Sequence, residues 1–499
     1  MTGEALLGLV MLLVMIGTIF VGFPISFTLL FLALTFGYFG LGHVVFDLAY
    51  FQTIGLMKEE LLAAVPLFVL MGFITERAGL MERLFIALRL ALAPVRGALF
   101  VVVIITAATF AMATGIVGAA VTVLGIMAAP IMNKTGYDPK LAAGAITAGG
   151  TLGILIPPSV MLIVMGPVLG VSVIDLYAAA LIPGFMLAAF YLSYLLGRSF
   201  FNPKLGPPVP KEERAASAFV VVREVLVGVV PLVGLITATL GSILAGLATP
   251  TEASAVGAFG AILLALAYRK LIWRAFHRAL LQSMATSSMV LFLAVTSNVF
   301  GAVFARLGSA EWITQMLLGL ELSPTLMLVM IMVLIFLLGW PFEWPAIVLV
   351  FVPIFYPVVL ALEFDLVWFG ALVAVTLQTA FLSPPVAMSA YYLKQVVKDW
   401  SLATIYKGMF EFMGIQVVAI ALIIAFPAIA TWLPDYLFRS GALVVQEPTV
   451  APATADPYVG YGDSYEAQLR RSVQRAQQRE RSAAKQAPAA PQPPGPPQQ

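Results

Sequence analysis

Two pairs of adjacent prolines interrupt long apolar stretches of the chain, at Pro157–Pro158 and at Pro384–Pro385. Proline has no backbone N–H and pushes the preceding residue, here Ile156 or Ser383, out of the helical conformation, so a helix must break at each pair. Each break frees carbonyl oxygens, which a membrane interior tolerates only where the backbone is buried in protein or lines a polar cavity. Hydroxyl groups flank both breaks, on Thr147, Thr151 and Ser159 and on Thr376, Thr379 and Ser383.

These oxygen atoms predict a cation site at each break. Free carbonyl and hydroxyl oxygens suit a hard cation such as sodium, and broken helices hold coupling ions in membrane transporters. The half-helix that follows each break points the positive end of its dipole at the same cavity, which suits a carboxylate substrate. A plain proline kink without a ligand is the alternative, and the occurrence of two breaks in register favours the site.

The register comes from an internal repeat with an offset of 227 residues. The matched positions are Pro130 with Pro357, Asp138 with Asp365, and Pro157–Pro158 with Pro384–Pro385. A similar offset, 229 residues, separates Arg77–Gly79 from Arg306–Gly308. Each half has five expected membrane crossings, an odd number, so the second half should be inverted relative to the first.

The composition requires a membrane. Apolar residues make up 61% of the 499 residues, charged residues make up 10%, and the mean hydropathy is +1.01. A water-soluble chain of this length needs more charge to cover its surface. The absence of cysteine excludes disulfides, thiolate metal sites and iron–sulfur clusters, and the two histidines lie in different segments, which argues against a histidine metal cage.

The sequence therefore predicts an all-α polytopic membrane protein. The first apolar run suits two spanning helices and not a cleaved leader. Expected spans cover 6–22, 24–40, 61–78, 141–170, 176–200, 220–243, 250–268, 281–304, 366–396 and 409–433, of which 141–170 and 366–396 are the broken helices. Re-entrant hairpins are expected at 99–132 and 324–360, and amphipathic helices along the membrane surface at 82–96 and 269–278. The expected domains are a first repeat (1–200), a linker (201–219), a second repeat (220–435) and a disordered Pro- and Gln-rich tail (441–499).

Charge sets the expected orientation. With the N-terminus in the periplasm, almost all Lys and Arg residues fall on the cytoplasmic side, and only Lys58, Arg306 and Arg439 are periplasmic outside the tail. Ten crossings then place the tail in the periplasm of a bacterial inner membrane.

The predicted hairpin tips are further candidates for the cation and substrate site. They comprise Thr114, Gly115 and Gly118 in the first hairpin, and Gly339 and Glu343 in the second. A carboxylate inside apolar sequence is costly and usually functional, so Glu343 either holds a coupling cation or caps a half-helix. Asn298 is a weaker candidate that can equally hydrogen-bond across helices. Thr249-Pro250-Thr251-Glu252 reads as a capping box, although a substrate role for Glu252 stays open.

The sequence resembles the large membrane subunit of the TRAP (tripartite ATP-independent periplasmic) transporters over residues 5–435. The motifs that carry the resemblance are Pro66-Leu67-Phe68 with Gly72, Lys134-Thr135-Gly136-Tyr137-Asp138, Ile156-Pro157-Pro158-Ser159, Ile182-Pro183-Gly184, Thr249-Pro250-Thr251-Glu252-Ala253 and Ser383-Pro384-Pro385. The resemblance implies a sodium-coupled elevator that works with a small four-helix membrane subunit and a periplasmic substrate-binding protein. Sodium would serve as the coupling ion at Thr114, Ser159, Glu343 and Ser383, with no other cofactor.

One departure from the family concerns the first hairpin tip. Where the family usually has a Ser-Gly-Ser type sequence, this chain has Thr114-Gly115-Ile116-Val117, so one hydroxyl is lost and coordination must rely on backbone oxygens or on Ser159. The sequence around Trp344-Pro345 and Gln378–Pro385 resembles a branch of the family linked to monocarboxylates and 2-oxoacids. Dicarboxylates are a further possible substrate class.

Other functions fit the sequence less well. A stand-alone sodium/carboxylate symporter or antiporter of the wider ion-transporter superfamily is the main alternative, and it would need no binding protein. An intramembrane enzyme would need a catalytic set such as Ser/His/Asp, HExxH or paired aspartates, and none is present in the sequence. A channel is disfavoured because discontinuous helices in inverted repeats suit alternating access.

Overall fold

The computed structural model describes residues 3–208, 217–384 and 387–439, and this part of the chain is helical with no β-strand. Eight of its helices are long and apolar enough to cross a membrane, or nine if the bent pair Glu60–Arg77 and Leu80–Leu92 forms one span. The prediction of an all-α polytopic membrane protein is confirmed. The predicted tail 441–499 and Pro385 lie outside the described residues.

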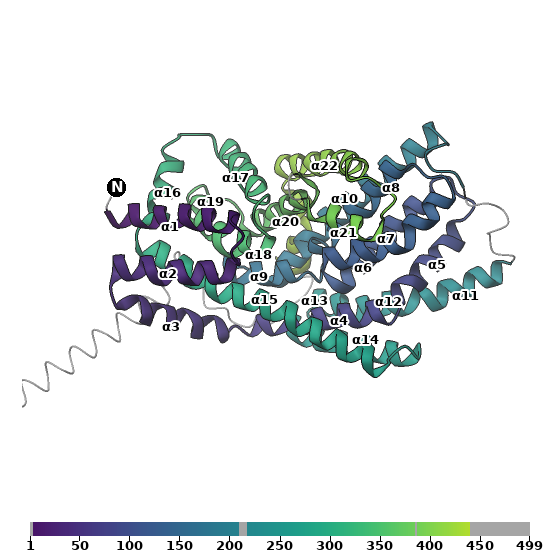
Figure 1. The fold of residues 1–499 in the computed structure, drawn as a ribbon, viewed down its shortest axis with the longest axis horizontal. Helices are drawn as coiled ribbons and strands as arrows, with labels where there is room; N and C mark the ends of the chain where they lie inside the picture. Colours follow the sequence, from purple (N-terminus) through teal and green to yellow (C-terminus); the bar gives the residue numbers. More distant parts are fainter. Residues whose placement is uncertain (1–2, 209–216, 385–386, 440–499) are drawn as a thin grey trace, which may run out of the picture. The chain divides into compact units, whose positions relative to one another are not determined.

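One set of helices gathers around α15 (Trp273–Arg306), which packs against α2 (Ile25–Leu41), α3 (Val44–Met57) and α4 (Ala64–Arg77). Helix α1 (Gly3–Phe20) packs on α2, and α14 (Pro250–Ala267) packs on α4 (Figure 1). The remaining members are the 3-10 turn η1 (Glu60–Ala63), α11 (Ala218–Gly228), α12 (Val230–Ile236), the π-helical turn η4 (Thr237–Gly241) and α13 (Ser242–Leu244).

The second set contains the stretches predicted as hairpins and broken helices. Its first half comprises α6 (Ala98–Thr114), α7 (Val117–Lys134), α8 (Pro139–Thr151), the 3-10 turn η2 (Leu152–Ile154), α9 (Val160–Leu169) and α10 (Val173–Phe201). Its second half comprises α17 (Pro324–Leu338), α18 (Trp344–Ala346), the π-helical turn η5 (Ile347–Phe351), α19 (Val352–Ala361), α20 (Leu366–Leu382), α21 (Met388–Val396), α22 (Leu402–Ala425), α23 (Ala428–Pro434) and the π-helical turn η6 (Asp435–Arg439).

Two amphipathic helices lead from the first set into the second, α5 (Leu80–Leu92) and α16 (Ser309–Leu318). Each follows a glycine in the left-handed conformation, Gly79 with φ 69° and Gly308 with φ 76°. These are the glycines of the Arg-x-Gly repeat, and the conformation is one that residues with a Cβ adopt at a cost. The chain bends by 58° where α4 passes into α5.

The repeat markers occupy matching structural positions in the two halves. Pro130 lies inside α7 and Pro357 lies inside α19. Asp138 caps α8 by accepting from the Leu141 N–H at 2.8 Å, and Asp365 caps α20 by accepting from the Trp368 N–H at 2.9 Å. That the halves are inverted relative to the membrane stays a prediction.

The long helix of each half packs against the broken helix of the other half. Helix α22 packs closely on α8, because a Cβ on Gly408 would lie only 2.1 Å from the Lys140 carbonyl oxygen. Helix α10 packs on α20, where a Cβ on Gly370 would lie 2.7 Å from the Leu176 side chain. Each broken helix is therefore supported by the long helix of the other half.

The capping box at the start of α14 is confirmed. Thr249 Oγ1 accepts from the Glu252 N–H at 3.2 Å, and the Glu252 carboxylate accepts from the Thr249 N–H at 2.9 Å.

Four segments differ from the prediction. Helices α3 and α16 were not predicted as elements. The basic segment 269–278 is not a separate surface helix, since Trp273 starts the 34-residue α15 and no proline interrupts it up to Arg306. The span expected at 409–433 is α22 followed by α23, because α22 ends at Ala425 just before Pro427.

Candidate functional site

The first helix break lies between η2 and α9. Because Pro157 and Pro158 lack N–H groups, the carbonyls of Gly153 and Ile154 lose the partners that a continuous helix would give them. The buried Ser159 hydroxyl donates to the Ile154 oxygen at 2.6 Å and so replaces the missing N–H there. The Gly153 oxygen has no such replacement from Ser159.

The tip of the first hairpin rests on this break. Gly115, between α6 and α7, has φ 63°, and a Cβ built on it would lie 3.7 Å from the carbonyl oxygens of Gly153 and Pro158. It would also lie 3.6 Å from the N atom of Val160. Two backbone oxygens thus lie close to the hairpin tip, and a cation site at this tip stays a prediction.

The second hairpin tip packs on the last turn of α20, just before the second break. A Cβ on Gly339 would lie 2.3 Å from the Ala380 Cβ, so the tip touches α20 directly. Ala380 is the repeat equivalent of Gly153, and Pro384 deprives its carbonyl of the helical partner just as Pro157 does for Gly153. The Ser383 hydroxyl makes a long hydrogen bond of 3.4 Å to that carbonyl.

Glu343 starts α18, but its side chain makes no capping hydrogen bond. The carboxylate is exposed, and within the described residues it has no hydrogen bond or ion pair. The structure therefore gives no support to the alternative in which Glu343 is a helix cap. Glu343 interacts electrostatically with Tyr392 of α21. The Tyr392 ring also lies 3.1–3.3 Å from the position of a Cβ on Gly118, at the start of α7.

The other predicted hydroxyl groups are buried and already form hydrogen bonds within the protein. Thr147 donates to the Ala143 oxygen at 2.7 Å, Thr151 to the Ala148 oxygen at 2.8 Å, and Thr379 to the Thr376 oxygen at 2.5 Å, while Thr376 donates to the Met332 sulfur at 3.4 Å. Asn298 donates to Gln52 of α3 at 3.0 Å, so it bonds across helices. The Thr114 side chain lies outside the described part of the structure.

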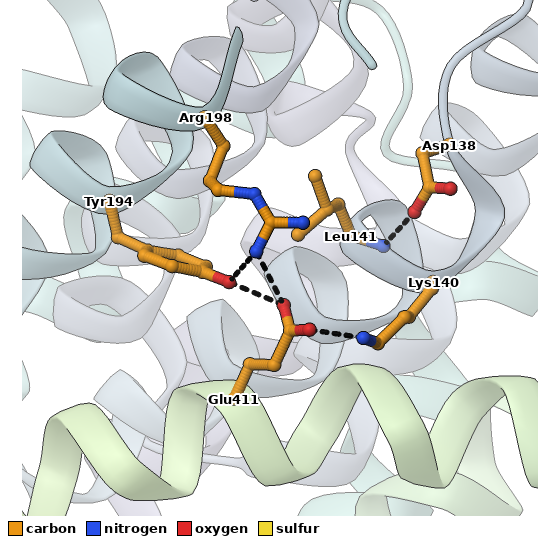
Figure 2. Close-up of polar contacts among 6 residues, drawn as sticks. All are labelled: Asp138, Lys140, Leu141, Tyr194, Arg198 and Glu411. Carbon is orange, nitrogen blue, oxygen red and sulfur yellow. Dashed lines mark hydrogen bonds and ion pairs between the residues drawn. The ribbon is translucent and has the colours of Figure 1, made fainter. Parts of the chain in front are cut away.

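A polar cluster that the sequence did not reveal joins α8, α10 and α22 (Figure 2). Glu411 of α22 forms an ion pair with Lys140, accepts from the Tyr194 hydroxyl, and lies 3.8 Å from the Arg198 guanidinium, which itself donates to Tyr194 at 2.8 Å. Glu411 falls inside the predicted span 409–433, and a carboxylate within an apolar stretch is the signal that would have singled it out. Gln378, the repeat equivalent of Thr151, was also missed; it is fully buried, and neither of its amide atoms has a partner within the described residues.

Two hairpin tips resting on two broken helices define the chain as a polytopic membrane transport protein. The fold is similar to that of the YdaH transporter of Alcanivorax borkumensis, with a TM-score of 0.55 and 14% identity over 79% of this chain and 89% of that one. The model of the family described as "Tripartite ATP-independent periplasmic transporter, DctM component" matches residues 10–429. The chain belongs to this family, as the resemblance predicted.

Individual relatives are similar along nearly their whole length. The C4-dicarboxylate TRAP transporter large permease protein DctM of Rhodobacter capsulatus is 28% identical over 441 residues, which cover 85% of this chain and 98% of the relative. The sialic acid TRAP transporter large permease protein SiaM of Vibrio cholerae is 30% identical over 430 residues, with the same coverage of both chains. The protein is thus a large permease subunit.

Proposed function

We propose that this chain imports a small carboxylate across the bacterial inner membrane, driven by sodium, together with a small four-helix membrane subunit and a periplasmic binding protein. The observation that carries the proposal is the contact of each hairpin tip with a repeat-equivalent position, Gly153 and Ala380. At both positions a proline four residues later removes the backbone N–H that would bond the carbonyl oxygen in a continuous helix, so this oxygen can bind a hard cation. Transport measurements with and without a sodium gradient therefore test whether sodium drives uptake.

The helix sets suggest how the site would move. The second set carries both tips and both breaks, and the chain enters it from the α15-centred set through α5 and α16. The left-handed glycines before these connectors, Gly79 and Gly308, are where the backbone direction changes. An elevator, in which the second set slides past the first, would use these two junctions as its hinges.

The substrate class rests on chemistry and on relatives. The relatives named above are permeases for C4-dicarboxylates and for sialic acid, and both are carboxylates. Family membership also favours the tripartite system over the stand-alone symporter or antiporter. Among the carboxylates, we prefer a monocarboxylate or a 2-oxoacid as the substrate, because of the sequence motif at the second break.

Uptake into proteoliposomes tests the proposal. Vesicles holding this chain and its small subunit, supplied with the loaded binding protein, should accumulate carboxylate only under an inward sodium gradient. Replacing both Pro157 and Pro158 by alanine should restore the amide donors and abolish uptake while leaving membrane insertion intact. Equal uptake with sodium replaced by potassium, or normal uptake by the double variant, would contradict the cation site at the first break.

The expected orientation is tested separately, with cysteines added to this cysteine-free chain. Cysteine at the exposed position Phe201 should resist an impermeant maleimide applied from the periplasm, and cysteine at the exposed Glu363 should react. The reverse pattern would overturn the predicted orientation.

A further inference from the structure

Tyr392 lies beside the tip of the first hairpin. It belongs to the second turn of α21, the helix that follows the second break. The atom nearest to a Cβ on Gly118 would be the Tyr392 ring carbon that carries the hydroxyl, at 3.1 Å, with the two neighbouring ring carbons at 3.2 and 3.3 Å. The phenolic end of the ring, and not its body, is therefore next to the first hairpin tip.

The second hairpin tip carries a charge that acts on the same tyrosine. Glu343 interacts electrostatically with Tyr392, and its carboxylate is exposed and without a partner in the described part of the chain. The Tyr392 side chain is partly exposed, and its hydroxyl likewise has no hydrogen bond within that part. The adjacent Tyr391 differs, because its hydroxyl bonds to Tyr406. A phenol donor beside the first tip and a carboxylate on the second tip thus interact electrostatically, and neither has a hydrogen-bond partner within the described residues.

We propose that Tyr392 is a substrate-contacting residue, whose hydroxyl donates a hydrogen bond to a carboxylate oxygen of the transported molecule between the two hairpin tips. This inference rests on the proposed function and specifies its substrate contact. A neutral phenol is a suitable donor here, since it attracts an anion without competing with the coupling cation. Glu343 repels the anion unless a cation lies between them, so the carboxylate binds only after sodium.

Thermal stabilisation of the full-length permease, purified with its small subunit, tests this contact. Sodium should raise the midpoint of unfolding, and pyruvate or succinate added with sodium should raise it further, because a ligand that binds the folded state stabilises it. Tyr392→Phe removes only the hydroxyl. It should leave the sodium effect and the starting midpoint unchanged and raise the half-saturating carboxylate concentration about ten- to a hundredfold, the worth of a hydrogen bond to a charged group.

Two further variants sharpen the test. Tyr391→Phe is the matched control and should leave carboxylate binding unchanged. Gly118→Ala should weaken carboxylate binding with Tyr392 intact, because the new methyl group displaces the phenolic end of the ring.

The outcomes separate the two proposals. A wild-type protein that sodium stabilises but neither carboxylate does would refute the proposed substrate class and this inference with it. If carboxylate stabilises the wild-type protein and Tyr392→Phe has the same half-saturating concentration, the proposed role of Tyr392 is refuted. The proposed substrate class then stands.

Discussion

Replacing Gly408 by alanine should separate α22 from α8 and damage the first half of the site. The new Cβ would lie 2.1 Å from the Lys140 carbonyl oxygen and 2.9 Å from the Gly144 nitrogen. Ordinary van der Waals contact begins at 3.4 Å, so the helices must move apart by about 1.3 Å. Both obstructing atoms are backbone and cannot rotate away, so the helices themselves have to shift.

The size of the effect follows from two opposing terms. Overpacking of this kind costs about 3 kcal/mol, at the upper end of the usual range. Alanine recovers about 1 kcal/mol, because it is a better helix former than glycine. The expected net loss is about 2 kcal/mol of stability, together with a raised sodium requirement, since α8 leads into the first break.

Gly414 supplies the matched control in the same helix. A Cβ there would meet nothing within 4 Å, so Gly414→Ala should stabilise α22 by roughly 0.5–1 kcal/mol and leave transport unchanged. Thermal inactivation of the purified permease and sodium-dependent uptake in proteoliposomes measure the two effects. Equal stability and equal sodium dependence in Gly408→Ala and Gly414→Ala would refute the close packing of α8 on α22.

Three further substitutions test individual side chains. Glu343→Gln should raise the sodium concentration for half-maximal uptake at least tenfold, because a cation loses a charged ligand, with no change in stability since Glu343 caps nothing; unchanged sodium dependence would remove it as a ligand. Glu411→Gln should lower stability by about 1 kcal/mol, and less so in high salt, because its ion pair with Lys140 is partly exposed. Thr249→Ala should lower stability by about 1 kcal/mol through loss of the cap without affecting uptake; lost uptake at full stability would instead indicate a substrate role for Glu252.

Local signals predicted local structure well. The capping box of Thr249 follows from four consecutive residues, and the helix caps at Asp138 and Asp365 lie at positions that the repeat had already matched. The stretches assigned to hairpins and broken helices also correspond to helix pairs, because prolines and glycines interrupt helices wherever they occur.

Contacts between segments that lie far apart in the chain could not be predicted from the sequence. Nothing near Tyr392 in the chain indicates that Gly118 touches it, since that contact depends on how α21 packs on α7. The length of α15 was missed for a different reason. Its basic first turns, with Arg274 and Arg278, look like a surface helix, and only packing shows that the same helix continues through the apolar stretch to Arg306.

The packing of each long helix against the broken helix of the other half has a consequence for biosynthesis. Gln416 of α22 donates to Thr151 of α8 at 3.4 Å across 265 residues of chain. At about 5–20 residues per second, a ribosome needs tens of seconds to make that intervening length. The first broken helix therefore enters the membrane long before α22 exists, and a chain that stops short of Leu402 leaves the side of α8 that contacts α22 uncovered. In nascent chains stalled before that point, a cysteine introduced at Thr151 should react with a membrane-permeant maleimide, whereas in full-length chains it should be protected.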